Sequence, residues 1–241
     1  MEDDRASTTP LSGSLGDGDG DGDGDGDGDV IGEPRWPMVG AVVAAIVLTL
    51  LLPDDLRLGP NWALPVLEAA LLVVLIGGDP GSITRRSRAL RAVGIALVAV
   101  LGLSAMAATG FLIDSLVTGG PETDSASELL EAGAIVWISN NIAFALLYWE
   151  LDSGGAAARA HGLPAYPDIA FPQQLTPHVV APGWRPRFID YLYLGFTNAT
   201  ALSPTDAMPL APWAKIAMTV QSLISLLLLA LVIARAVNVL D

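Results

Sequence analysis

The sequence predicts an all-α integral membrane protein with about five transmembrane helices and a short re-entrant or interfacial helix before the last one. Of the 241 residues, 52% are apolar and only 16% are charged, which is too little charge for the surface of a soluble domain. Long apolar stretches recur along the chain. Each ends at glycine, proline, acidic residues or tryptophan, as expected at the boundaries of a bilayer.

The hydrocarbon core of a bilayer is about 30 Å thick and takes roughly 20 apolar residues per helix. Five stretches approach this length, so we expect a multi-pass protein of the cell membrane whose first partner is the lipid bilayer. Residues 35–241 would form this helical membrane domain. The predicted spans are residues 36–52, 62–77, 92–117, 132–149 and 213–240.

Residues 1–34 have a different composition, with eleven acidic residues and one basic residue, Arg5. Gly and Asp alternate through residues 16–29. Such a segment has no apolar surface to bury and repels itself, so we expect a disordered acidic tail. Its Asp-Gly repeat matches the start of a calcium-binding loop, but Glu33 is out of phase with the bidentate ligand at the twelfth position.

Several kinds of chemistry have no support in the sequence. The chain has no cysteine, which excludes disulfides and thiolate catalysis. His161 and His178 stand apart from any clustered carboxylates, so we expect no metal site. Nucleotide-binding and nucleophile motifs are absent, and no basic stripe is interleaved with aromatic residues. We therefore expect no enzyme activity, no cofactor and no nucleic-acid partner.

The basic residues predict the orientation in the membrane. With the N-terminus in the cytoplasm, ten Lys and Arg residues lie inside, and only Arg57 and Arg235 lie outside. Cytoplasmic loops carry the excess of Lys and Arg in membrane proteins. The N-terminus and the Pro-rich loop, residues 153–186, should therefore be cytoplasmic.

From Phe188 onward the chain resembles the pore module of tetrameric potassium channels. Residues 188–206 resemble the pore helix and the segment after it. Asp206 and Pro209 fall where that family has its post-filter Asp and Pro. Residues 132–149 and 213–240 resemble the outer and inner helices. The resemblance implies a homo-oligomer around a pore, and the chain from Trp36 also looks like uncharacterised bacterial multi-span membrane proteins.

The sequence departs from that family at the filter. A potassium filter reads T-V-G-Y-G, whereas residues 201–205 read A-L-S-P-T. The glycines allow the dihedral angles that point carbonyls at the ion, and Pro204 restricts them. Potassium selectivity is therefore not implied. The family's pore loop also enters from outside, whereas the arginines place this segment inside, and we base the expected topology on the arginines.

Polar side chains within or beside the spans are candidates for a solute pathway, because lipid cannot satisfy them. For Asn140 and Asn141 the alternative is hydrogen bonding between helices, and for Glu68 it is a carboxyl that is protonated, snorkelled or paired. For the other candidates it is a capped turn before the last helix. The candidates are Asn198, Thr200, Ser203, Thr205, Asp206, Asn140, Asn141 and Glu68.

Two functions are consistent with these observations. The first is channel-like conduction of an ion or small solute through an oligomeric pore. The alternative is a non-conducting membrane protein that keeps only the pore-module architecture and serves assembly or partner binding.

Overall fold

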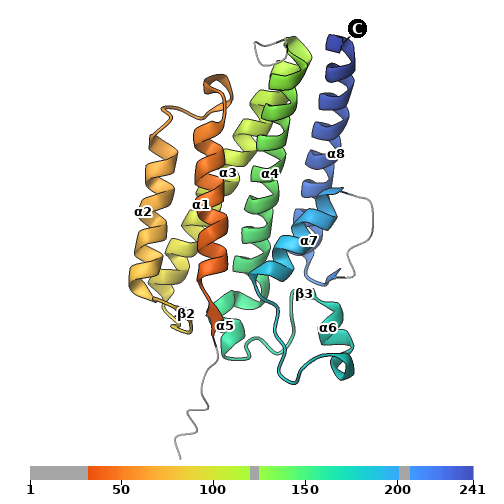
Figure 1. The fold of residues 1–241 in the computed structure, drawn as a ribbon. Coiled ribbons are helices and arrows are strands. Elements are labelled where there is room, and N and C mark those ends of the chain that lie inside the picture. Colours follow the sequence, from red (N-terminus) through yellow and green to blue (C-terminus); the bar gives the residue numbers. More distant parts are fainter. Residues whose placement is uncertain (1–31, 120–124, 201–206, 241) are drawn as a thin grey trace, which may run out of the picture.

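The computed structural model describes residues 32–119, 125–200 and 207–240, and this part of the chain is mostly helical (Figure 1). Successive long helices run in opposite directions and form an antiparallel bundle, with a shorter helix, α7, before the last one. The all-α fold class is confirmed. The helices are α1 (Trp36–Leu51), α2 (Ala63–Gly78), α3 (Arg88–Thr118), α4 (Ala126–Leu151), α7 (Phe188–Thr200) and α8 (Pro212–Leu240).

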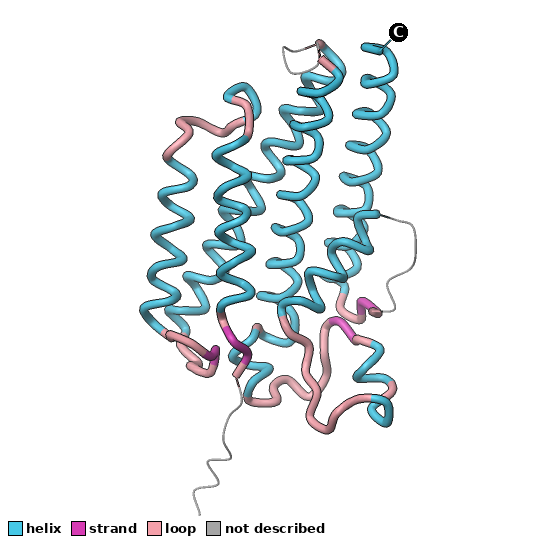
Figure 2. The backbone as a smooth tube through the Cα atoms, in the orientation of Figure 1, coloured by secondary structure: helices cyan, strands magenta, loops and turns pink. Residues whose placement is uncertain are grey.

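Most short elements gather at one end of the bundle, which we call the base: residues 32–34, 79–87, 152–187 and 207–211 (Figure 2). Two antiparallel strand pairs close it, β1 (Glu33–Pro34) with β2 (Ser82–Ile83), and β3 (Ile169–Ala170) with β4 (Met208–Pro209). The predicted Pro-rich loop 153–186 lies in the base. It contains α5 (Ala156–Ala160), α6 (Pro172–Leu175), β3 and a 3-10 turn, Pro177–Val179, while similar turns occupy Asp152–Gly154 and Asp54–Leu56.

Three helical segments within the described residues are long and apolar enough to cross a membrane: Arg88–Thr118, Ala126–Gly154 and Pro212–Val237. Helices α1 and α2 have 16 residues each, or about 24 Å at 1.5 Å per residue. That is shorter than the hydrocarbon core. The structure therefore supports three spans by length, and the predicted number of five stays a prediction.

Helix α4 is the centre of the bundle and contacts α1, α3, α7 and α8. In the most apolar 18-residue stretch of α4, 67% of the residues are buried. In the corresponding stretch of α8 only 28% are buried, so α8 lies at the periphery of the bundle. Residues 142–146 are buried consecutively, as expected for a helix surrounded on all sides. A Cβ at Gly195 of α7 would lie 3.3 Å from the carbonyl oxygen of Asn141, so glycine lets α7 pack closely on α4.

The structure differs from the expected boundary of the tail. Glu33 and Pro34 were assigned to the tail, but they form β1 and belong to the base. In α7, Phe188 and Tyr191 are buried, whereas Phe196 is 51% exposed. The ring of Phe196 contacts Trp137 of α4 edge to face, at a centroid distance of 5.9 Å.

Candidate functional site

A cavity of about 730 Å³ lies at the base end of the bundle, among α1, the end of α2, the start of α3, the end of α4 and α5. Its volume falls within the range of about 300–1,000 Å³ that is typical of small-molecule sites. The deeper wall is apolar and continuous with the core of the bundle. It is lined by Met38, Val42, Leu75, Leu97, Val98 and Leu146.

Five arginines also line this cavity: Arg35, Arg85, Arg86, Arg88 and Arg91. Arg85, Arg86 and Arg88 are exposed, so they mark the part where the cavity opens. Only two carboxylates, Asp79 and Glu150, are among the lining residues, and the wall carries a net positive charge. One cavity is therefore lined both by arginines and by buried apolar side chains.

The loop that carries these arginines is organised by Asp79, the residue after α2. Its Oδ2 atom accepts the backbone N–H groups of Thr84 and Arg85, each at 3.3 Å. The same oxygen forms a buried ion pair of 3.2 Å with Arg35, whose Nε also donates to the Asp79 carbonyl. The β1–β2 pair then fixes the loop against the start of α1. Arg35 is thus structurally paired, whereas Arg86, in this fixed loop, and Arg88, the first residue of α3, are exposed.

The start of α3 adds to the positive field. Ser87 caps this helix, with its hydroxyl oxygen accepting the N–H of Leu90 at 3.4 Å. The first turn contains Arg88 and Arg91 and no acidic residue. A helix N-terminus carries partial positive charge, and arginine there costs stability. Guanidinium groups together with the free N–H groups of a helix N-terminus favour an anion.

Glu150 is the acidic side chain on the inner part of this wall. It is 8% exposed and lies against α3 at Gly94, where an added Cβ would be 3.1 Å from its Oε1. Within the described residues, no hydrogen bond or ion pair involves its carboxylate. Arg91, Arg159 and Arg35 act on it only through space.

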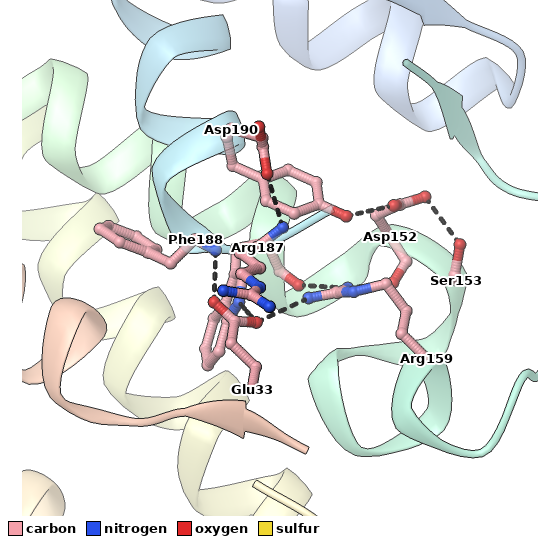
Figure 3. Close-up of polar contacts among 9 residues, drawn as sticks. Glu33, Asp152, Ser153, Arg159, Arg187, Phe188 and Asp190 are labelled. Carbon is pink, nitrogen blue, oxygen red and sulfur yellow. Dashed lines mark hydrogen bonds and ion pairs between the residues drawn. The ribbon is translucent and has the colours of Figure 1, made fainter. Parts of the chain in front are cut away.

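A polar network supports the wall formed by the end of α4 and by α5 (Figure 3). Arg159 is 6% exposed and donates from Nη1 to the carbonyls of Trp149 and Asp152, at 2.8 and 2.7 Å. Its guanidinium lies 5.0 Å from the ring centroid of Tyr191, a cation–π contact. Glu33 accepts the indole N–H of Trp149 at 2.9 Å and the N–H of Phe188.

Asp152 forms the second part of this network. Its Oδ1 accepts the N–H groups of Asp168 and Ile169 and the hydroxyl of Ser153, each at 3.0 Å. Its Oδ2 accepts the hydroxyl of Tyr191. The carboxylate therefore joins the end of α4, the 168–169 segment and α7. Both oxygens of Asp152 are thus engaged, and the network holds α5 and α7 beside the end of α4.

Burial changes the acidity of two carboxyls in the base. Desolvation raises the pKa of Glu33, and the hydrogen bonds from Trp149 and Phe188 and the charges of Arg159 and Arg187 oppose this shift. Desolvation also raises the pKa of Asp190, opposed by the N–H and the charge of Arg187. Both residues flank the entry of the chain into α7.

The sequence-predicted site residues do not converge on one pathway in the described part of the chain. Asn198 donates to the Met218 carbonyl at 2.9 Å and to Gln221 at 2.8 Å, which joins α7 to α8. The hydroxyl of Thr200 bonds back to Thr197 within α7. Gln221 in turn accepts the Tyr148 hydroxyl at 2.8 Å. Ser203, Thr205 and Asp206 lie outside the described residues.

The other candidates lie elsewhere in the bundle. Asn140 donates to Thr109 of α3 at 2.7 Å, whereas Asn141 donates to the Trp137 carbonyl of its own helix at 3.1 Å. Interhelical bonding, one of the expected alternatives, thus holds for Asn140. Glu68 is fully buried in α2, and neither of its carboxylate oxygens has a hydrogen-bond partner among the described residues.

Sequence reasoning did not predict the cavity. Arg85, Arg86, Arg88 and Arg91 served only to orient the chain, and Glu150 marked the end of a span. Four arginines within seven residues ahead of a span were the available signal. Their convergence with Glu150 depends on the antiparallel pairing of α3 and α4, which composition does not specify.

Comparison with family models, with curated proteins and with solved structures finds no match to this chain. The fold and the cavity by themselves define a class. This is a helical-bundle protein with helices suited to crossing a membrane and a mainly apolar cavity with several arginines at its base.

Proposed function

We propose that this chain is a membrane-embedded binding protein for a phosphate-bearing amphiphile, with the arginine-rimmed cavity as the binding site. The observation that carries the proposal is that one cavity is lined both by exposed arginines and by buried apolar side chains. This proposal names a ligand class for the partner-binding alternative that the sequence left open.

Each of these two sets of lining residues matches one half of such a ligand. Guanidinium groups bind phosphate oxygens through paired, charge-assisted hydrogen bonds. Burial of an alkyl chain against the apolar wall contributes about 0.8 kcal/mol per CH₂ group. Basic pockets between helices on the cytoplasmic side are a recurring site for anionic lipid head groups. A small polar solute would leave the wall around Val42, Leu97 and Leu146 without a partner.

The proposed setting is a cell-membrane protein with five crossings, a cytoplasmic N-terminus and the base in the cytoplasm. The two 16-residue helices would then cross with flanking residues extended towards the interfaces or with local thinning of the bilayer. In this setting the exposed arginines of the cavity lie at the level of the inner head groups. A homo-oligomer remains part of the proposal, with the exposed apolar side chains of α8 available to lipid or to a second copy.

Ligand titration followed by native mass spectrometry of the purified protein tests the proposal. The probes are phosphatidic acid, diacylglycerol and inorganic phosphate, which separate the contributions of phosphate and chain. We expect phosphatidic acid to bind more tightly than either fragment. The double substitution Arg86→Gln with Arg88→Gln should weaken it about tenfold or more, because each lost charge-assisted contact costs about 1.5 kcal/mol or more.

The matched control is Arg57→Gln with Arg185→Gln, which removes the same charge away from the cavity. Equal loss in both double variants would show only general attraction to positive charge. Equal binding of inorganic phosphate and phosphatidic acid would contradict the amphiphile.

Channel-like conduction is the second candidate, and the placement of α7 favours it. Helix α7 packs between α4 and α8, as a pore helix packs between outer and inner helices. The segment where a filter would follow, residues 201–206, lies outside the described residues. Ion flux above that of empty liposomes would support this candidate, and lipid binding without flux would favour the first.

A further inference from the structure

The carboxylate of Glu150 is the feature of the cavity that an anionic ligand alone leaves unexplained. It lines the cavity, is 8% exposed and has no hydrogen bond or ion pair within the described part of the chain. Its oxygens are not among the fully enclosed polar atoms of the described residues, so they are accessible from the cavity and can meet a ligand there. The carboxylate also repels the phosphate that the surrounding arginines attract.

Arg35, Arg91 and Arg159 act on this carboxylate through their charge, but none of them forms an ion pair with it within the described residues. Arg35 is paired with Asp79 at 3.2 Å. The guanidinium of Arg91 packs against α5, where a Cβ at Gly155 would lie 2.7 Å from its Nη1. Arg159 is committed to the carbonyls of Trp149 and Asp152. Glu150 itself fits against Gly94, because a larger residue there would meet the carboxylate.

We propose that Glu150 selects ligands whose phosphate carries a neighbouring hydrogen-bond-donating ammonium group, so that the preferred amphiphile is a phospholipid of the ethanolamine type. The proposal rests on the proposed function and names its ligand class. The arginines bind the phosphate, and Glu150 accepts N–H donors from the ammonium and pairs with its charge. The cavity wall thus carries positive charge for the phosphate and negative charge for the ammonium of a zwitterionic head group.

The test compares phosphatidylethanolamine with its mono-, di- and trimethylated derivatives on the unmodified protein by native mass spectrometry. Methylation keeps the charge and removes the N–H donors one at a time. We expect affinity to fall stepwise, with phosphatidylcholine about tenfold weaker than phosphatidylethanolamine. This series needs no substitution in the protein, so folding cannot confound it.

Substitution of Glu150 then locates the effect. In Glu150→Leu, and partly in Glu150→Gln, the preference for ethanolamine over choline should disappear, while phosphatidic acid should bind as well as before or better. Glu131→Gln, an exposed carboxyl near the other end of α4, is the control and should leave the preference unchanged.

The outcomes separate the two proposals. An equal affinity for all four head groups, or a preference that survives in Glu150→Leu, would overturn the role of Glu150 alone. Lipid binding that is indifferent to Arg86→Gln with Arg88→Gln would overturn the proposed function itself.

Discussion

Asp152 is the residue on which the base depends most directly. Its relative exposure is zero, and its carboxylate accepts hydrogen bonds from two backbone N–H groups and two hydroxyls. It follows the last turn of α4, where the chain reverses through Ser153 at φ 53° and Gly154 and Gly155 at positive φ. A side chain that satisfies so many donors at a reversal fixes the position of α5 and, with it, one wall of the cavity.

We expect Asp152→Ala to lower the free energy of unfolding by about 3 kcal/mol or more, because each buried donor left unsatisfied costs about 1–3 kcal/mol. In a chain of this size that corresponds to a fall in Tm of about 10 °C. Asp152→Asn is the matched variant: it keeps an acceptor for the backbone N–H groups and should lose about a third as much. Thermal unfolding in detergent measures both, and a fall of less than about 2 °C for Asp152→Ala would contradict the role.

The sequence predicted the contacts of single residues only where a polar side chain would lie within the lipid, because leaving it there without a hydrogen bond costs free energy. Asn140 was expected to bond between helices or line a pathway, and it bonds to Thr109 of α3. Asp152 and Arg159 were not singled out as structural residues, because their partners are identified only in the fold: Tyr191 is 39 residues from Asp152. Long-range pairing of this kind is not visible in local composition.

At the scale of elements, hydropathy placed the helices well. The predicted spans 36–52, 62–77 and 213–240 match α1, α2 and α8 within one residue at each end. The acidic stretch before span four was expected to be a connection, yet α4 begins at Ala126 and includes Glu128 and Glu131. Both glutamates are exposed, so the helix continues beyond its apolar part. The two strand pairs, with two residues per strand, have no signal of their own in the sequence.

Gln221 joins three helices and provides a test of how α7 is held. It accepts from Tyr148 of α4 and Asn198 of α7, and its Nε2 donates to the Gly195 carbonyl at 2.9 Å. Gln221→Leu would leave the Tyr148 hydroxyl, the Asn198 amide and the Gly195 carbonyl without these hydrogen bonds. We expect a loss of about 3 kcal/mol in the free energy of unfolding, seen as a lower Tm in detergent.

Thr219→Val is the control on the exposed side of α8, because the Thr219 hydroxyl bonds only to the carbonyl of Lys215. It should change Tm by no more than about 1 °C. A Gln221→Leu protein as stable as the control would mean that water satisfies these groups, as in a solute pathway, and would strengthen the channel alternative.

At the scale of the whole molecule, the base gathers the start of α1, the α2–α3 loop, the end of α4 and the start of α8 (Figure 1). Nine of the twelve basic residues belong to or flank this end within the described residues, among them Arg35, Arg159, Arg187 and Lys215. The positive-inside rule assigns that end to the cytoplasm. Several of the arginines on which the expected topology rests therefore also line the cavity, which is why they were counted for orientation and not recognised as a site.

Single cysteines test this orientation, since the natural chain has none. We expect cysteine at Ser82 or Ala165, both in the base, to resist an impermeant thiol reagent in intact cells. Cysteine at Ser125, at the start of α4 on the other end, should react. Permeabilised cells provide the control, in which all three positions should be labelled. Reaction at Ser82 and Ala165 alone would invert the topology.

Because polar loops gather at the base, the two ends of the bundle also differ in how easily they can cross a membrane. The base contains buried ion pairs and many hydrogen-bonded loops, and such a body does not pass through hydrocarbon. At the other end, the connection between α1 and α2, residues 52–62, contains one 3-10 turn, Asp54–Leu56. We therefore expect detergent-solubilised protein added to preformed vesicles to leave its base in the outer solution. The cavity then meets the outer leaflet, where ligands can be added and exchanged without breaking the vesicle.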